Sequence, residues 1–161
     1  MRSEANFSAC RKYRYALWRV WDESKPYAMF IGLNPSTADE INDDPTVRRC
    51  IQFAKDWGYG GLCMSNIFAY RATDPNDMKE VQEPVGPEND LWLKKLSKDA
   101  GIVVAAWGNH GLHLGRSSEV TSFIPNLKYL KLNKSGEPCH PLYLRSDSLP
   151  TAFEVSSLYP A

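Results

Sequence analysis

The pattern of apolar and polar residues predicts that strands and helices alternate along this chain. Residues 13–21 and 27–33 are rich in aromatic and branched side chains, and the polar segment 22–26 between them suits a turn. We therefore expect these two strands to pair with each other. Further buried strands are predicted over three apolar runs, at residues 62–69, 102–106 and 127–132.

Three segments with helical spacing separate the predicted strands. Asp44 followed by Pro45 is typical of an N-cap and first helical residue, and apolar residues recur at helical spacing from there to Gly58. Two more helices are predicted over residues 87–100 and 117–124. Because strand and helix alternate with short connections, we expect a three-layer α/β/α fold with a mainly parallel central sheet and an additional N-terminal β-hairpin.

Length and composition favour a single folded domain over residues 1–161. The hydrophobic fraction of 43% and the charged fraction of 24% are those of ordinary globular proteins, which argues against a disordered or collagen-like chain. No apolar stretch is long enough to span a membrane, and the first residues lack the apolar core of a signal peptide. We therefore expect a cytoplasmic protein that makes no membrane contact.

The cysteines and histidines do not indicate a metal site. The four cysteines are widely separated and form no C-x-x-C pair, so reduced thiols that act as small core hydrophobes fit best. His110 and His113 form an H-x-x-H pair, but no third ligand is spaced to join them. We expect no metal and no cofactor.

The charge balance is neutral, with 19 basic and 19 acidic residues. A general electrostatic attraction to phosphates, common in nucleic-acid binders, is therefore absent from the whole chain. Any contact with nucleic acid must be local.

Polar residues follow each predicted core strand. Asn34, Asn66, Asn109 and His140 each lie in or just after the end of one of these strands. In α/β sheets ligands bind beyond the carboxyl ends of the strands. We therefore expect these four side chains to point into one cleft.

Several segments carry a resemblance to known families. The segments GLNPSTAD, DPTVRR and NIFAYRATDP resemble a bacterial and phage family known only as a domain of unknown function. More distantly, the order of motifs resembles the uracil-DNA glycosylase superfamily, which has a three-layer α/β fold. Residues 32–36 match its G-x-x-P loop, residues 66–75 resemble its second motif, and residues 140–142 match its H-P-S loop except that leucine replaces the small residue.

The resemblance implies a DNA glycosylase that hydrolyses the N-glycosidic bond of a modified or mismatched pyrimidine. Asn34 would position the attacking water, Asn66 would bind the base edge, and His140 would donate to a base oxygen. DNA or a nucleotide would be the partner, and the flipped base would need a pocket. The other residues implied in base or ligand binding are Gly32, Pro35, Ser36, Phe68, Arg71, Asn109, Pro141 and Leu142. Phe30 or Phe68 would stack on the base, residues 142–144 would fill the vacated stack, and Arg71 and Arg145 would hold phosphates.

Departures from the superfamily leave alternatives open. An asparagine such as Asn34 cannot deprotonate water, so Asp39 is a second candidate for the base, and the polar cluster of Asp39, Asp44 and Arg48 has no counterpart in the resemblance. Asn34 and Ser36 would otherwise cap a helix, and Asn66 would be a buried amide satisfied by backbone. The missing acid and the zero net charge favour a different class of function: a non-catalytic module that binds a nucleotide, modified DNA or a protein partner through the same cleft.

Overall fold

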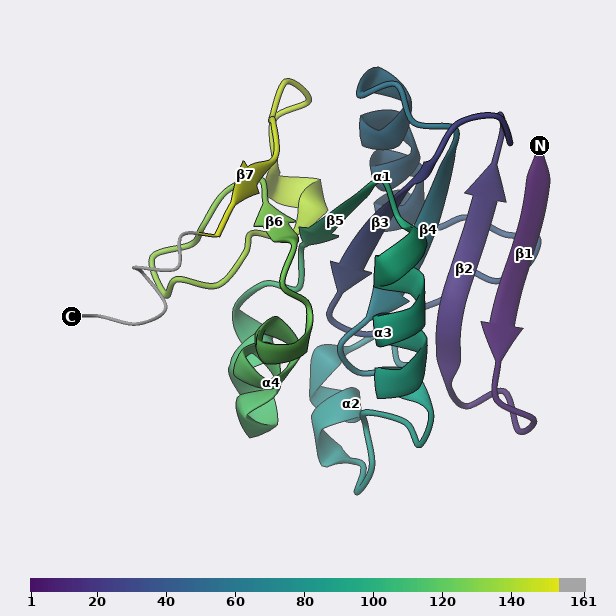
Figure 1. The fold of residues 1–161 in the computed structure, drawn as a ribbon. Coiled ribbons are helices and arrows are strands. Elements are labelled where there is room, and N and C mark those ends of the chain that lie inside the picture. The colour runs from purple at the N-terminus through teal and green to yellow at the C-terminus, as the bar shows by residue number, and fades with distance from the viewer. Residues whose placement is uncertain (154–161) are drawn as a thin grey trace.

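A seven-stranded sheet organises the part of the chain that the computed structural model describes, residues 1–153 (Figure 1). The strand order is β1-β2-β4-β3-β5-β6-β7. The strands are β1 (Arg2–Phe7), β2 (Arg14–Val20), β3 (Tyr27–Gly32), β4 (Gly61–Asn66), β5 (Ile102–Ala105), β6 (Leu127–Tyr129) and β7 (Thr151–Ala152).

The sheet is mixed. Strand β3 runs parallel to β4 and β5, and β5 runs parallel to β6. The pairs β1–β2, β2–β4 and β6–β7 are antiparallel. The mixed α/β class is as predicted. The expectation of a mainly parallel sheet needs correction, because β1 and β2 at one edge of the sheet and β7 at the other pair in antiparallel fashion.

The predicted pairing of residues 13–21 with residues 27–33 is wrong. Strand β4 lies between β2 and β3, and its Met64 is opposite Leu17 on one side and Phe30 on the other. All six residues of β4 are buried, as suits an interior strand. The N-terminal hairpin is formed instead by β2 with β1, an edge strand whose polar sequence RSEANF lacks a strand pattern.

The helices begin close to where the sequence predicts them. They are α1 (Pro45–Asp56), α2 (Pro75–Glu80), α3 (Asn89–Asp99) and α4 (Arg116–Phe123), and short 3₁₀ turns span Asn109–Gly115 and Pro141–Tyr143. Helix α1 starts as expected, because the Asp44 side chain accepts a hydrogen bond from the Val47 N–H at 2.8 Å. Helix α2 was not predicted.

Two apolar cores lie on opposite faces of the sheet. Successive side chains of a strand point to opposite faces, so Phe30 packs with Phe53 of α1 while Ile31 belongs to the core that includes Leu93 of α3 and Val120 of α4. Figure 1 shows α1 behind the sheet and α3 in front of it, and Met78 of α2 and Val120 of α4 pack in the same core as α3. Helices on both faces leave the strand ends as the place where loops meet.

The cysteines occupy mainly core positions, as expected. Cys50, Cys63 and Cys139 are buried and free, whereas Cys10 is free but exposed in the loop between β1 and β2. The expectation that all four act as core hydrophobes is therefore wrong for Cys10.

Candidate functional site

A cavity of about 850 Å³ opens at the carboxyl ends of β3, β4 and β5. It is lined by residues 32–37 at and beyond the end of β3, by Asn66 at the end of β4 and by residues 106–110 after β5. Residues 44–47 at the start of α1 and the loop with His140 complete its walls. Small-molecule sites usually enclose roughly 300–1,000 Å³, so a base with its sugar fits this volume.

The structure brings together most of the residues that the sequence singles out. Those that line the cavity are Gly32, Asn34, Pro35, Ser36, Asn66, Asn109, His140 and Leu142. Those that do not line it are Asp39, Phe68, Arg71 and Pro141. These residues therefore lie around one cavity. What they can bind depends on which of their polar atoms have no hydrogen-bond partner within the described residues.

Asn34 has its amide nitrogen held by backbone. Its Nδ2 donates to the carbonyl oxygen of Ala72 at 2.7 Å and to that of Pro35 at 3.2 Å. Its Oδ1 accepts no hydrogen bond within the described residues. Neither Asn34 nor Ser36 caps a helix, since Asp44 caps α1. Asn34 therefore offers the cavity an acceptor that cannot take up a proton.

Asn66 is buried, and a cation orients its amide. The Arg14 guanidinium donates from Nη2 to Asn66 Oδ1 at 3.3 Å, so Nδ2 is the remaining donor group. No described residue accepts from Nδ2. A Cβ on residue 32 would lie 3.0 Å from that nitrogen, so the glycine at this position is what allows the amide so close. The side chain of Asn66 is thus held by arginine and not by backbone.

His140 is a neutral hydrogen-bond donor at neutral pH. Its Nδ1 accepts from the Leu142 N–H at 3.2 Å, so the proton of the neutral ring is on Nε2. Burial lowers the pKa of His140 below its ordinary value of 6.5, and the carboxylate of Asp44 opposes this shift. The ring therefore presents Nε2–H as a donor in the cavity wall.

The two candidate carboxylates have different surroundings. Oδ1 of Asp39 accepts from the backbone N–H groups of Ile41 and Asn42 at 2.9 and 2.7 Å, and these bonds lower the pKa of Asp39. Asp39 shapes its own loop and does not line the cavity. Asp44 does line it, and while one of its oxygens accepts from Val47, the other accepts from no described residue.

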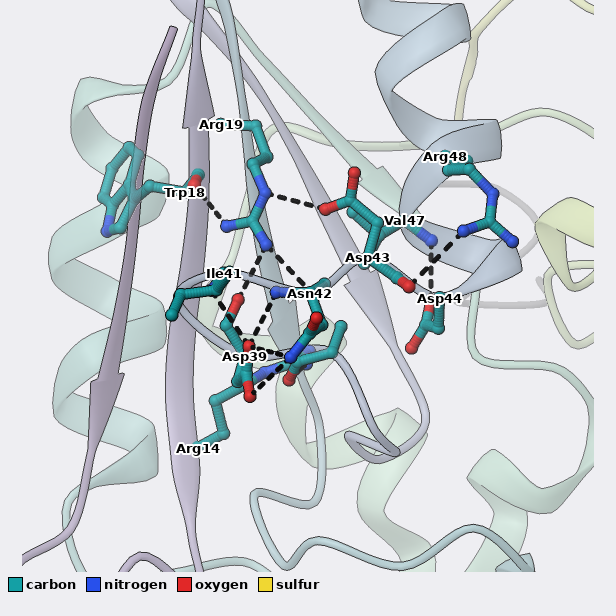
Figure 2. Close-up of polar contacts among 11 residues, drawn as sticks. Arg14, Trp18, Arg19, Asp39, Ile41, Asn42, Asp43, Asp44, Val47 and Arg48 are labelled. Atoms are coloured by element: carbon teal, nitrogen blue, oxygen red, sulfur yellow. Dashed lines mark hydrogen bonds and ion pairs between the residues drawn. The ribbon is translucent and has the colours of Figure 1, made fainter.

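The cluster of charges before α1 is a structural clamp around Arg19 (Figure 2). Arg19 is 1% exposed, and its Nε pairs with Asp43 Oδ1 at 2.8 Å. Its Nη2 donates to the carbonyl oxygens of Asp39 and Asn42 at 2.7 and 3.2 Å. Arg48 is exposed and reaches only the Asp43 carbonyl, at 3.4 Å. The clamp fixes the loop that delivers Asp44 to the cavity.

Several predicted ligand-binding residues have structural contacts instead. Phe30 and Phe68 are fully buried in the two cores and do not line the cavity, so neither supplies the expected stacking surface. The guanidinium of Arg71 lies 4.7 Å from the centre of the Phe7 ring. Pro141 is buried and begins a 3₁₀ turn.

Residues 142–144, which were expected to fill the vacated stack, are divided between the cavity rim and the core. Leu142 and Tyr143 line the cavity and are 46% and 81% exposed. Leu144 is buried against α1 and belongs to the core. Arg145 is exposed and pairs with Asp147 at 3.2 Å. Of residues 142–144, Leu142 and Tyr143 therefore stand at the cavity mouth.

Asn109 joins two loops at the rim. Its Oδ1 accepts from Asn133 Nδ2 at 3.0 Å and from Ser135 Oγ at 2.6 Å. These bonds hold the loop after β5 against the turn that precedes residue 136.

Arg14 and Trp107 are cavity residues that the sequence reasoning did not assign. Trp107 lies two residues beyond the end of β5, and that position was the available signal; its Nε1 donates to Glu137 Oε2 at 2.7 Å. Arg14 begins β2, which runs antiparallel to β4, so the start of β2 lies at the same sheet edge as Asn66. Arg14 could not be recognised from the sequence, because only the residues that follow each predicted strand were considered and Arg14 lies at the start of its strand.

The described residues contain neither a metal-binding group nor a membrane-spanning helix. Within residues 1–153, no group of three or more His, Cys, Asp or Glu side chains is arranged to hold a metal ion. In the same range, no helix has the length and apolar character needed to cross a membrane.

The fold and the cavity define a mixed α/β protein with a ligand-sized site at its strand ends. Residues 14–142 match the family described as "Protein of unknown function (DUF1643)", and the chain belongs to that family. No match was found among curated proteins or among solved structures. The matched region contains every residue that lines the cavity except Tyr143.

Proposed function

We propose that this protein is a DNA glycosylase that binds a modified or mismatched pyrimidine in the cavity and hydrolyses its N-glycosidic bond. The observation that carries the proposal is the meeting of two free donors, Asn66 Nδ2 and His140 Nε2, with the acceptor groups of Asn34 and Asp44 in one cavity. The donors suit a leaving base, and the acceptors suit a water molecule.

The two donors favour a base with carbonyl oxygens. Arg14 can only donate, so Asn66 Oδ1 must face it and Nδ2 is left for the ligand. His140 likewise has Nδ1 in use and Nε2–H free. When the bond to the sugar breaks, negative charge develops on the base, and fixed donors of this kind stabilise it.

Asn34 and Asp44 are assigned to the water. Oδ1 of Asn34 accepts a hydrogen bond from the water and orients it. The free carboxylate oxygen of Asp44 takes up its proton, a step that the amide cannot perform. Asp44 replaces Asp39 in this role, because the Asp39 carboxylate is bound within its own loop.

The resemblance to the uracil-DNA glycosylase superfamily remains part of the proposal. The parallel strand set β4-β3-β5-β6, the helices on both faces and the cavity at the carboxyl ends support a three-layer arrangement of that kind. Leu142 and Tyr143 at the mouth are suited to fill the gap left by a flipped base.

Single-turnover cleavage tests the proposal. Excess protein is mixed with oligonucleotides that carry uracil, hydroxymethylated or glucosylated pyrimidines, or mismatches, and abasic sites are detected by alkaline strand cleavage. We expect product on at least one substrate, with Asn34→Ala and His140→Ala each reducing the rate by about 100-fold or more. His113→Ala is the matched control, because His113 is also partly buried but does not line the cavity.

The competing class is a non-catalytic binding module, which the amide at position 34 favours. Measurable binding to these oligonucleotides without any abasic product would establish that class and refute the glycosylase. The salt dependence of affinity then separates ligands: a steep loss with salt indicates phosphate contacts, whereas a flat response indicates a small molecule or a protein.

A further inference from the structure

Arg14 differs from the other fully buried arginines of the described chain. Arg19 pairs with Asp43, and Arg116 pairs with Asp90 and Glu119. Arg14 is 2% exposed, and no carboxylate of the described residues forms an ion pair with it. The protein thus pairs two buried guanidinium groups with carboxylates in direct contact. The third lines the cavity and makes no such ion pair with a described residue, although the charge of Asp44 in the same cavity acts on it.

The guanidinium of Arg14 also has donors to spare. Of its five N–H groups, Nη1 donates to the Ala38 carbonyl at 3.0 Å and Nη2 to Asn66 at 3.3 Å. Its Nε is buried and has no hydrogen-bond partner, and Nη1 and Nη2 each keep a second N–H that no described residue accepts. Burial lowers the pKa of Arg14 to about 10, so the group stays charged at neutral pH. A buried charge with unused donors is costly unless a partner arrives.

We propose that Arg14 binds the anionic carbonyl oxygen of the departing base, so that this residue and Asn66 form the leaving-group site of the cavity. The inference rests on the proposed function. Arg14 assists in two ways: it faces the developing charge directly, and it holds Asn66 with Nδ2 toward the base. Because arginine can only donate hydrogen bonds, the substrate is then a pyrimidine that places a carbonyl oxygen, and not an amino group, beside Arg14 in the cavity.

The reaction balances with the groups present and water. A C1′–O bond forms to the water as the C1′–N bond breaks, and the electron pair of the broken bond passes to the ring nitrogen and carbonyl oxygens of the base. The water proton goes to Asp44 and is returned to the base when it is released. Arg14 keeps its protons throughout and contributes charge and hydrogen bonds only.

The ease with which the base leaves provides the test. Fluorine at position 5 of uracil stabilises the base anion, so its departure needs less help from Arg14. We expect Arg14→Met to lower the single-turnover rate by about 100-fold on uracil DNA and by a clearly smaller factor on 5-fluorouracil DNA. Arg14→Lys, which keeps the charge without the planar fork, is expected to fall between wild type and Arg14→Met. The control is Arg116→Met, which removes an equally buried arginine away from the cavity and is expected to change both rates by the same factor.

A binding measurement with barbiturate distinguishes a failure of this inference from a failure of the proposed function. Barbiturate is a pyrimidine anion with its charge on carbonyl oxygens at neutral pH, and it resembles the departing base. We expect it to raise the melting temperature of wild type and of Arg116→Met but not of Arg14→Met. Wild type that yields no abasic product but binds barbiturate through Arg14 refutes the glycosylase and keeps the anion site. Equal rate losses on both substrates, or barbiturate shifts that do not depend on Arg14, overturn the inference.

Discussion

Replacing Arg19 by Met tests whether the clamp before α1 holds the cavity wall. The substitution removes the ion pair with Asp43 and the hydrogen bonds to the carbonyl oxygens of Trp18, Asp39 and Asn42. Breaking a buried ion pair by removing one partner costs about 3–5 kcal/mol. Because the Asp43 side chain is 32% exposed and can be rehydrated, the low end of that range, about 3 kcal/mol, is expected.

Urea denaturation followed by circular dichroism measures the loss. For a domain of this size a loss of about 3 kcal/mol corresponds to a fall of roughly 6–12 °C in Tm. Arg48→Met is the control, since Arg48 is exposed and makes a single long bond to the same loop, and it should stay within about 0.5 kcal/mol of wild type. An Arg19→Met protein as stable as the Arg48→Met protein would refute the clamp.

Three further predictions concern the cavity wall. Gly111→Ala should lower stability by about 1–3 kcal/mol, seen as a lower Tm, because the new Cβ would lie 2.2 Å from Cδ1 of Trp107; an unchanged Tm would contradict this contact. Asp44→Ala should lower the free energy of unfolding, measured in urea, by about 1 kcal/mol because α1 loses its N-cap, whereas Asp44→Ser keeps a capping side chain. Both variants should lose glycosylase activity, because neither has a carboxylate to take up the proton of the water. An active Asp44→Ser protein would show that Asp44 does not act on the water. Lowering the pH through 6.5 should destabilise wild type more than His140→Asn in urea titrations, because folded His140 has a lowered pKa and the unfolded chain binds the proton first; equal pH slopes would contradict the lowered pKa.

Local sequence signals predicted the elements well but not their order in space. The Asp44-Pro45 pair marks the start of α1 because an N-cap depends on only a few neighbouring residues. Nothing local states that β4 inserts between β2 and β3, because strand pairing is decided by contacts between distant segments. The polar strand β1 is held by pairing with β2 and not by its own composition.

For the candidate site too, local sequence signals identified some residues, while those that depend on contacts between distant segments were not identified. Asn34, Asn66 and His140 were found because each lies at or beyond the end of a core strand, and the ends of parallel strands meet at one edge. The sequence could not tell which carboxylate of the loop faces the cavity, because Arg19 on a distant strand sets that loop's course. Arg14 was missed because antiparallel pairing brings the start of its strand to the same edge.

The most direct test of the central claim is a crystal structure of the protein with an oligonucleotide that carries deoxypseudouridine. This base is joined to its sugar by a carbon–carbon bond, so it cannot be hydrolysed and stays in place. The base should lie in the cavity with carbonyl oxygens within hydrogen-bond distance of Asn66 Nδ2 and His140 Nε2. A base that remains stacked in the DNA, or that binds away from these two donors, would contradict the claim that the cavity recognises a pyrimidine.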